Sequence, residues 1–262
     1  MGDPFEEGDF FERPVHEVTV SPFYMGKHEV SKALWDRVYS WSLTNGYMFY
    51  HAGMAKETNE PVCGLSWYAC VKWCNARSEM EGYDPAYTTN GSVYRAGEAI
   101  PHCNWGASGY RLPTEAEWEF AARGGITGQR FPWGDEITHA QADYFSTNFF
   151  SYDTSETRGF NPLYAVGEMP YTCPVNAFEP NSFGLYNMAG NVMEWCYDGS
   201  GDYSGEPQEN PSGRDQGSER ILRGGDWSDD ADFSRTANRV SRLPFLTADT
   251  VGFRLLRQVS SP

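Results

Sequence analysis

Glycine and proline occur along the whole length of this chain, and this distribution constrains its fold more than any other sequence feature. The 27 Gly and 16 Pro are spread along 262 residues rather than gathered in one tract. Because such residues favour turns and end regular elements, short helices and strands must alternate with long shaped loops. With 9 Trp, 16 Tyr and 16 Phe, the chain can still bury a large aromatic core. We therefore expect one ordered domain over residues 1–262, with modest regular structure and long packed loops.

The charge balance excludes one class of partner. A formal net charge of -16 repels phosphate backbones and anionic lipid, and no dense cluster of Lys or Arg acts against it. Nucleic acid is therefore not an expected partner. No run of about 18 apolar residues suggests a transmembrane segment. The absence of a coiled-coil pattern favours a monomer.

Cysteine and histidine spacing gives no sign of a metal or redox centre. The 6 cysteines are too sparse for a disulfide scaffold, and none forms a CxxC pair. Cys70 and Cys74 lie four residues apart in a helical pattern, which favours two small buried hydrophobes over a reactive pair. The 5 histidines are scattered without HxxH or HExxH spacing, so metal catalysis is not predicted.

Helical patterns appear in three segments. Residues 32–41 follow Ser31, a suitable N-cap, and place Leu34, Val38 and Trp41 at helical spacing. Residues 67–80 follow a similar cap and predict a helix with one apolar stripe. The third helix, over residues 115–123, has a capping box from Thr114 and Glu117 and ends at two glycines.

Strand patterns occupy both ends of the chain. Residues 16–24 alternate polar and β-branched side chains before a proline turn, and the segments RILRGGDW and VGFRLLR contain short apolar runs. We expect the C-terminus to pair into a sheet. Residues 125–177 show no sustained period and predict packed loops.

Six segments together resemble the formylglycine-generating enzyme, or sulfatase-modifying factor, family. They match it in order and spacing across nearly the whole chain: RPVHEVTVSPFYMGKHEVS, GYRLPTEAEWEFAARGG, FPWGDE, FGLYNMAGNVMEW, RGGDW and VGFRLLR. The resemblance implies an α+β, C-type lectin-like fold with little regular secondary structure.

The resemblance fails at the two cysteines that bind copper in the family's enzymes. Those cysteines lie four and nine residues after the second Gly of the RGG motif, where this chain has Asp229 and Ser234. Copper(I) requires soft thiolate ligands, and neither a carboxylate nor a hydroxyl supplies one. We therefore expect no copper and no enzyme activity of the family's kind, and we expect the chain not to be an enzyme.

The C-terminal segment, about residues 223–254, is also similar to the variable proteins of diversity-generating retroelements. These proteins display mutated residues on a lectin-like scaffold, which here would include Arg223, Trp227 and Arg239. Mutagenesis of Asn codons at adenines cannot produce Lys, Glu, Gln or Met, and residues 226–251 contain none of them. The resemblance implies that the ligand-binding positions are Asp226, Ser228, Asp229, Asp230, Asp232, Phe233, Asn238, Val240, Ser241, Leu243 and Phe245.

A structural calcium site is a further implication of the family resemblance. Its ligands would be the side chains of Asn187 and Glu194 and the carbonyls of Gly190 and Val192, all of them hard oxygen donors. Asp143 matches a second family site more loosely. The alternative is a plain turn in which Glu194 pairs with an arginine.

Three functions remain open on the sequence. The first is a non-catalytic receptor or adhesin that binds a protein or carbohydrate ligand at its variable region. The second is a sulfatase-modifying-factor-family oxidoreductase or maturation enzyme with different chemistry, and the third is an accessory domain for assembly. The resemblance implies a cell-surface or extracytoplasmic location, with a lipid anchor on a segment that precedes residue 1.

Overall fold

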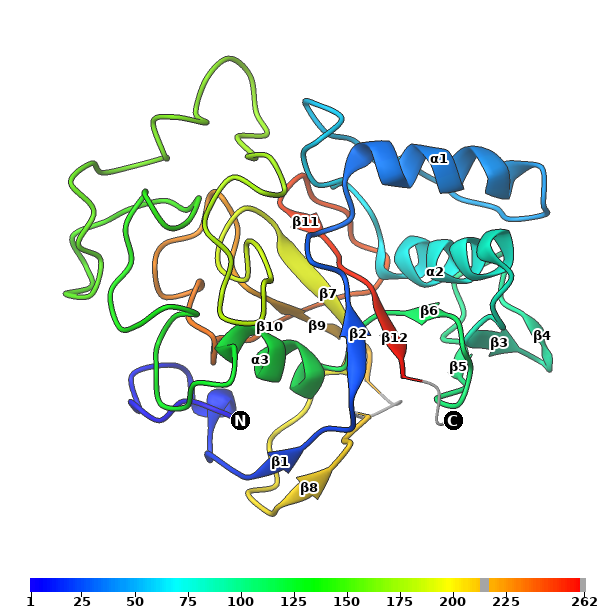
Figure 1. Ribbon diagram of the computed structural model, residues 1–262, viewed down its shortest axis with the longest axis horizontal. Coiled ribbons are helices and arrows are strands. Elements are labelled where there is room, and N and C mark those ends of the chain that lie inside the picture. Colours follow the sequence, from blue (N-terminus) through cyan, green and yellow to red (C-terminus); the bar gives the residue numbers. More distant parts are fainter. Residues whose placement is uncertain (213–216, 260–262) are drawn as a thin grey trace.

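The computed structural model describes residues 1–212 and 217–259, as a mixture of helices and short strands joined by long loops (Figure 1). The helices are η1 (Phe10–Glu12), α1 (Lys32–Leu43), α2 (Trp67–Glu81) and α3 (Glu115–Arg123). The strands are β1 (Val18–Thr19), β2 (Phe23–Met25), β3 (Tyr87–Thr89), β4 (Ser92–Val93), β5 (His102–Cys103), β6 (Tyr110–Arg111), β7 (Met193–Gly199), β8 (Gln208–Glu209), β9 (Arg220–Arg223), β10 (Val240–Arg242), β11 (Val251–Gly252) and β12 (Leu256–Gln258).

The three predicted helices are confirmed, but the buried faces of α1 and α2 differ from the prediction. In α1 the fully buried aromatic is Trp35, whereas Leu34 and Trp41 are only partly buried. In α2 the prediction of a single apolar stripe is wrong, because every residue from Trp67 to Ala76 is buried. Other segments cover this helix on all sides, so even Lys72 lies inside, where its ammonium group donates to the carbonyl of Met48 at 2.8 Å.

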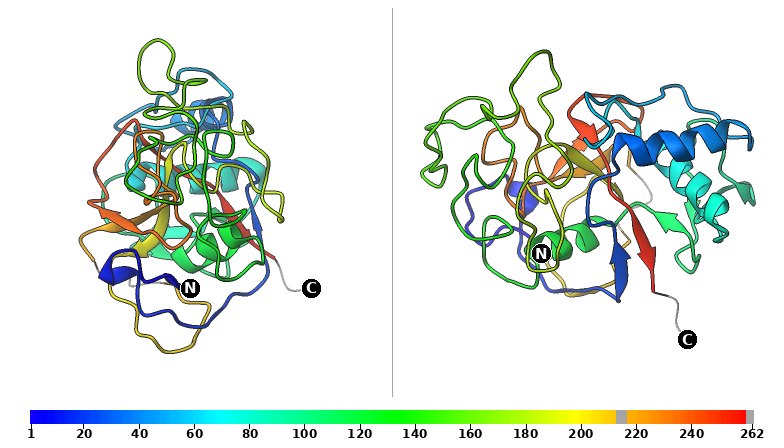
Figure 2. Two further views of the ribbon diagram at one scale, coloured as in Figure 1. Left: turned by 90° about the vertical axis from the view of Figure 1, so that its left-hand side faces the viewer. Right: turned by 45° about the horizontal axis from the view of Figure 1, so that its top comes forward.

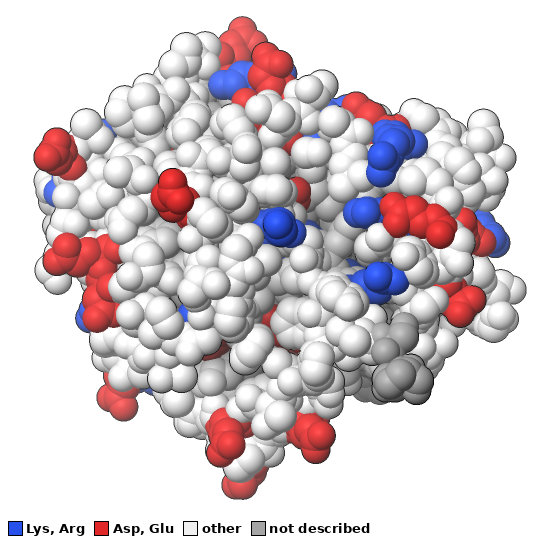
Figure 3. Space-filling model, in the orientation of Figure 1, with Lys and Arg blue, Asp and Glu red and all other residues white. Residues whose placement is uncertain are grey.

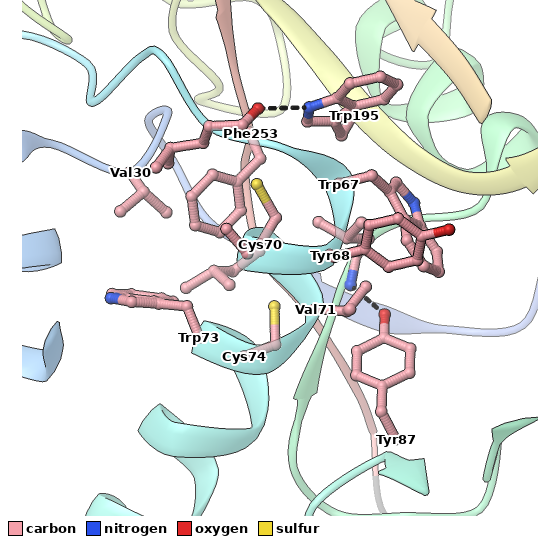
Figure 4. Packing of buried hydrophobic residues seen from close by; sticks show 14 of the residues in the cluster. Val30, Trp67, Tyr68, Cys70, Val71, Trp73, Cys74, Tyr87, Trp195 and Phe253 are labelled. Carbon is pink, nitrogen blue, oxygen red and sulfur yellow. Dashed lines mark hydrogen bonds between the residues drawn. The ribbon is translucent and has the colours of Figure 1, made fainter. Parts of the chain in front are cut away.

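The α2 cysteines lie in the core, as their spacing predicted. Cys70 and Cys74 are both fully buried, and Figure 4 shows their sulfur atoms inside the aromatic cluster around Trp73 and Phe253. All 6 cysteines of the chain are buried.

The predicted capping box of α3 is confirmed. The Thr114 hydroxyl accepts from the Glu117 backbone N–H at 3.2 Å, and the Glu117 carboxylate accepts from the Thr114 N–H at 2.8 Å. Gly124 ends the helix with a φ of 58°. The capping box therefore fixes the start of α3, which contacts β7 and β9.

A four-stranded sheet in the order β10-β9-β7-β11 forms the centre of the fold. Strand β11 pairs with β7 in parallel, and β12 pairs with both β2 and β6. The C-terminal segment therefore joins two sheets, which confirms its predicted pairing and places it beside the N-terminal strand β2.

The predicted loops between residues 125 and 177 are confirmed. Only isolated bridges occur there, such as Ile137 with Asp153 and Ser146 with Gly159. Figures 1 and 2 show these loops on the side of the molecule opposite α1 and α2. Within residues 1–212 and 217–259, no helix is long and apolar enough to cross a membrane.

Candidate functional site

The loop that follows β9 starts at two glycines. Any other residue at these positions would have a strained backbone. Gly224 and Gly225 have φ values of 99° and 72°. A Cβ on Gly225 would lie 2.9 Å from the carbonyl carbon of Phe233 and from the Ser234 hydroxyl. The close approach brings the two ends of the segment 225–234 together, so this segment forms a closed loop.

Hydrogen bonds within the loop hold its acidic residues in fixed turns. The Asp226 carboxylate accepts from the backbone N–H of Ser228 at 2.8 Å and from its hydroxyl at 2.7 Å. The backbone N–H of Asp226 in turn donates to the Asp229 carboxylate at 3.2 Å. Asp230 accepts from the N–H of Asp232 at 3.1 Å. These are Asx turns, which give the loop a defined shape without regular secondary structure.

Asp226 and Asp229 form a coupled carboxyl pair. Asp226 is 4% exposed, and burial raises its pKa. Burial and the charge of Asp226 raise the pKa of Asp229 to about 8. Because the two carboxyl groups lie close together, the titration of one affects the other.

Arg235 and Tyr152 hold the far end of the loop. Arg235 donates to Asp232 at 2.7 Å and to Glu12 of η1 at 2.9 and 3.1 Å. The Tyr152 hydroxyl also donates to Asp232, at 3.0 Å. Asp232 is therefore partly neutralised, whereas no basic side chain within the described residues pairs with Asp230.

Aromatic rings from a second loop border the acidic segment. The rings of Phe160, Tyr171 and Trp227 contact one another pairwise, with centroids 5.1 to 5.8 Å apart. Phe145 packs edge-on against Phe160 at 4.8 Å, and its backbone N–H donates to the carbonyl of Asp229 at 2.7 Å. The acidic loop and the aromatic cluster are thus neighbours.

The eleven predicted ligand-binding positions do not all lie on one accessible surface. Asp226 and Asn238 are 4% and 5% exposed, and Asn238 donates to Glu12 at 3.2 Å, so both serve the scaffold. For these two residues the structure argues against direct display. Phe233 and Val240 are partly exposed and also pack against the main core. The positions that remain at least partly exposed are Ser228, Asp229, Asp230, Asp232, Phe233, Val240, Ser241, Leu243 and Phe245.

The exposed positions fall into two groups. Ser228, Asp229 and Asp230 lie on the acidic loop beside the aromatic cluster. Val240 and Ser241 lie on β10, an edge strand, where they line a cavity of about 270 Å³ together with the phenylalanines of η1. The predicted scaffold residues Arg223, Trp227 and Arg239 are all buried.

The residues predicted for calcium do not fit that ion at Glu194. Arg254 donates to both oxygens of Glu194, at 2.5 and 2.6 Å, and Trp118 donates to the same carboxylate at 2.7 Å. This is the arrangement of the alternative, in which Glu194 pairs with an arginine. Asn187 does fit, because its buried side-chain oxygen has no hydrogen-bond partner in the described chain. Calcium binding stays a prediction.

The positions of the family's copper cysteines also do not fit that metal. The Asp229 carboxylate accepts from the backbone N–H of Asp226 at 3.2 Å, and the Ser234 hydroxyl is buried without a hydrogen-bond partner among the described residues. Both are hard oxygen groups. Across residues 1–212 and 217–259, no group of three or more His, Cys, Asp and Glu could hold a metal ion.

Several buried acidic residues escaped the sequence analysis or were matched only loosely. Asp143 and Glu60 are 1% and 5% exposed, and Glu29 is 2% exposed. One Asp143 oxygen has no hydrogen-bond partner among the described residues, and burial raises its pKa well above the usual range. Asp143 lies in a loop without periodicity, so no local signal predicted its burial. No local sequence signal predicted a cavity of about 450 Å³ that is lined by His16, Asp198 and other polar residues.

The fold and the loop define a C-type lectin-like protein of the formylglycine-generating-enzyme type. Residues 1–259 match the sulfatase-modifying factor enzyme 1-like domain, and the chain belongs to this family. The formylglycine-generating enzyme of Mus musculus is 33% identical over 267 residues, which cover 93% of this chain and 68% of the mouse protein. That of Streptomyces coelicolor is 31% identical and covers 97% of this chain and 84% of its own length.

The fold is also similar to a solved structure of a variable protein. Treponema denticola variable protein 1 superposes with a TM-score of 0.70 at 28% identity, and the match covers 93% of this chain and 87% of that one. The predicted fold class and both predicted resemblances are therefore confirmed.

The expectation that the chain is not an enzyme is wrong at the level of the family. Relatives at 31% to 33% identity over most of the chain are named formylglycine-generating enzyme, which places the chain in an enzyme family. The presence of Asp229 and Ser234 in place of the family's two cysteines does not outweigh similarity over the whole chain.

Proposed function

We propose that this chain is a ligand-binding protein that presents the loop from Asp226 to Phe233 as a recognition surface. A single observation carries the proposal: the loop separates buried framework residues from displayed ones. Arg223, Trp227 and Arg239 are buried, whereas Ser228 is exposed and Asp229 and Asp230 are half-exposed. The displayed residues can therefore change without loss of the fold, as a recognition surface requires.

The framework beneath the loop is held by ion pairs. Arg239 donates to both oxygens of Glu115, at 2.6 and 2.7 Å, and Arg223 pairs with Glu119. Both acids belong to α3, so the loop is attached to a helix. A rigid support of this kind lowers the entropy that a loop loses when it binds a ligand.

The ligand of this surface is a protein or a carbohydrate, because carboxylates beside aromatic rings can accept hydrogen bonds and pack against apolar groups. The similarity to Treponema denticola variable protein 1 supports a recognition role. The proposal concerns recognition and holds whether or not the bound ligand is then chemically changed. A position at the cell surface is part of the proposal.

Binding to glycan and protein arrays tests the proposal. We expect a bound partner to be lost when Ser228, Asp229 and Asp230 are all changed to Ala. A matched triple variant on α1, with Asp36, Arg37 and Ser40 changed to Ala, should keep the partner. Retention by the loop variant, or equal loss in both variants, would overturn the proposal.

A further inference from the structure

Several buried carboxyl groups lie close to the acidic loop. Asp143 carries an oxygen without a hydrogen-bond partner among the described residues, and the charges of Glu60 and Asp226 act on it. All three carboxyl groups are at most 5% exposed. A buried carboxyl group can ionise at low cost only when a cation compensates its charge, so a positive group nearby is favoured.

The chain itself supplies one cation at this place. The ammonium group of Lys56 lies 6.0 Å from the centre of the Tyr171 ring, and its positive charge lowers the pKa of Asp143. Lys56 is exposed and makes one other contact, a 3.2 Å hydrogen bond to the carbonyl of Val166. An alkylammonium group is therefore compatible with the aromatic cluster, and this one is weakly held.

The rings beside Lys56 have the composition of a cation-binding surface. Phe160 and Tyr171 are partly exposed, and Trp227 lies beneath them. Aromatic faces attract ammonium groups, and a neighbouring carboxylate strengthens the attraction. Asp229 lies at the border of the cluster, because the backbone N–H of Phe145, whose ring packs against Phe160, donates to the Asp229 carbonyl at 2.7 Å.

We propose that Phe160 and Tyr171, with the carboxyl group of Asp229, recognise a lysine side chain of a protein ligand, and that Lys56 is the intramolecular occupant which this lysine displaces. The inference rests on the proposed function, since it names the ligand class of the same surface. An organic cation suits the site better than a metal ion, because the described acidic residues are not grouped as metal ligands.

The wider surface agrees with a cationic partner. The net charge is -16, and Figure 3 shows acidic side chains projecting around the outline of one face. Such a field speeds the encounter with a basic protein and weakens as salt is added.

Fluorescence anisotropy with a labelled lysine-rich peptide tests the inference. The same peptide with every lysine acetylated keeps the length and loses the charge. We expect the lysine peptide to bind at least about 5-fold more tightly than the acetylated one. Asp229→Asn should weaken binding about 5-fold, whereas Asp36→Asn, which removes an acidic group from α1, should not.

Lys56 provides the sharpest comparison. Lys56→Met removes the internal occupant and should tighten binding of the lysine peptide about 3-fold or more. Lys32→Met on α1 makes the same change in net charge and should have a smaller effect. Tyr171→Leu should weaken binding, and if this variant does not fold, the Lys56 and Lys32 pair still decides the matter.

Two results would overturn the inference. One is equal binding of the lysine and acetylated peptides, and the other is an equal effect of Lys56→Met and Lys32→Met. Neither result would overturn the proposed function, because the array experiment tests the recognition surface separately. If the loop variant lost a ligand that has no lysine, that loss would support the proposed function but not this inference.

Discussion

Arg254 and Glu194 face each other in the interior of the fold and form a two-point ion pair, with N–O distances of 2.5 and 2.6 Å. Both residues are at most 1% exposed. The pair joins the segment between β11 and β12 to β7, and Arg254 also donates to the carbonyl of Tyr186. It therefore connects Arg254 to a segment that precedes it by 60 to 68 residues.

Breaking this pair on one side should be costly. We expect Arg254→Met to lower the free energy of unfolding by about 3–5 kcal/mol, because Glu194 would be left buried without its partner. The double variant Arg254→Met with Glu194→Met should cost less than Arg254→Met alone. Chemical denaturation of both variants measures this difference, and a larger loss in the double variant would contradict the prediction.

Calcium should stabilise the native chain only slightly. Because Arg254 already engages both oxygens of Glu194, we expect the melting temperature in excess CaCl2 to differ from that in EGTA by less than about 2 °C. In Arg254→Met the freed carboxylate should make the calcium effect larger. A shift of more than about 5 °C in the unchanged protein would instead show that calcium displaces Arg254.

Glu29 should make stability depend on pH. Burial raises its pKa from 4.5 to about 8, although the nearby Arg254 charge and the side chain of Asn191 oppose the shift. Since the folded state then binds more protons than the unfolded state between those values, stability is present below pH 4.5 and is lost as the pH rises towards 8.

The matched variant for this prediction is Glu29→Gln. Its free energy of unfolding should change less between about pH 5 and about pH 9 than that of the parent, by on the order of 1–2 kcal/mol. Some dependence will remain, because burial also raises the pKa of Asp198 to about 7. Identical pH profiles for the two proteins would refute the role of Glu29.

The thiols should be unreactive in the folded chain. All 6 cysteines are buried, and burial raises the pKa of Cys63 to about 12 and those of Cys173 and Cys196 well above the usual range. A thiol reagent such as DTNB should modify fewer than about one cysteine per native chain within minutes, and all of them after denaturation. Rapid modification of the native chain would show that a thiol is accessible.

Copper(I) should bind poorly unless thiolates are restored. We expect the parent to retain little copper after desalting, because Asp229 and Ser234 are hard oxygen groups. The double variant Asp229→Cys with Ser234→Cys should retain about one ion per chain. Mass spectrometry of metal content compares the two proteins, and stoichiometric copper in the parent would contradict the prediction.

Local signals predicted the elements of this fold better than its site. The caps at Ser31, Ser66 and Thr114 depend on residues within one turn, so they could be read directly. The burial of the loop positions could not be predicted in this way. Asp226 and Asn238 are buried by residues far away in sequence, Asn238 by Glu12.

The same limit applies to pairs and clusters formed across the chain. Glu194 and Arg254 are 60 residues apart, so the sequence favoured a calcium ligand at Glu194 over the ion-pair partner that the structure shows. The ring of Phe160 reaches Trp227 from a loop that has no periodicity. Both contacts form by packing between segments that are far apart in the chain. The residue spacing within either segment therefore could not predict them.

The pairing of β12 with β2 has a consequence for synthesis. Since β12 pairs with both β2 and β6, the sheet β2-β12-β6 cannot form until residue 258 has left the ribosome. The loop from Asp226 to Phe233 emerges before that moment. An altered residue in this loop is therefore present in a nascent chain whose fold is still incomplete, where exposed apolar surface favours misfolding.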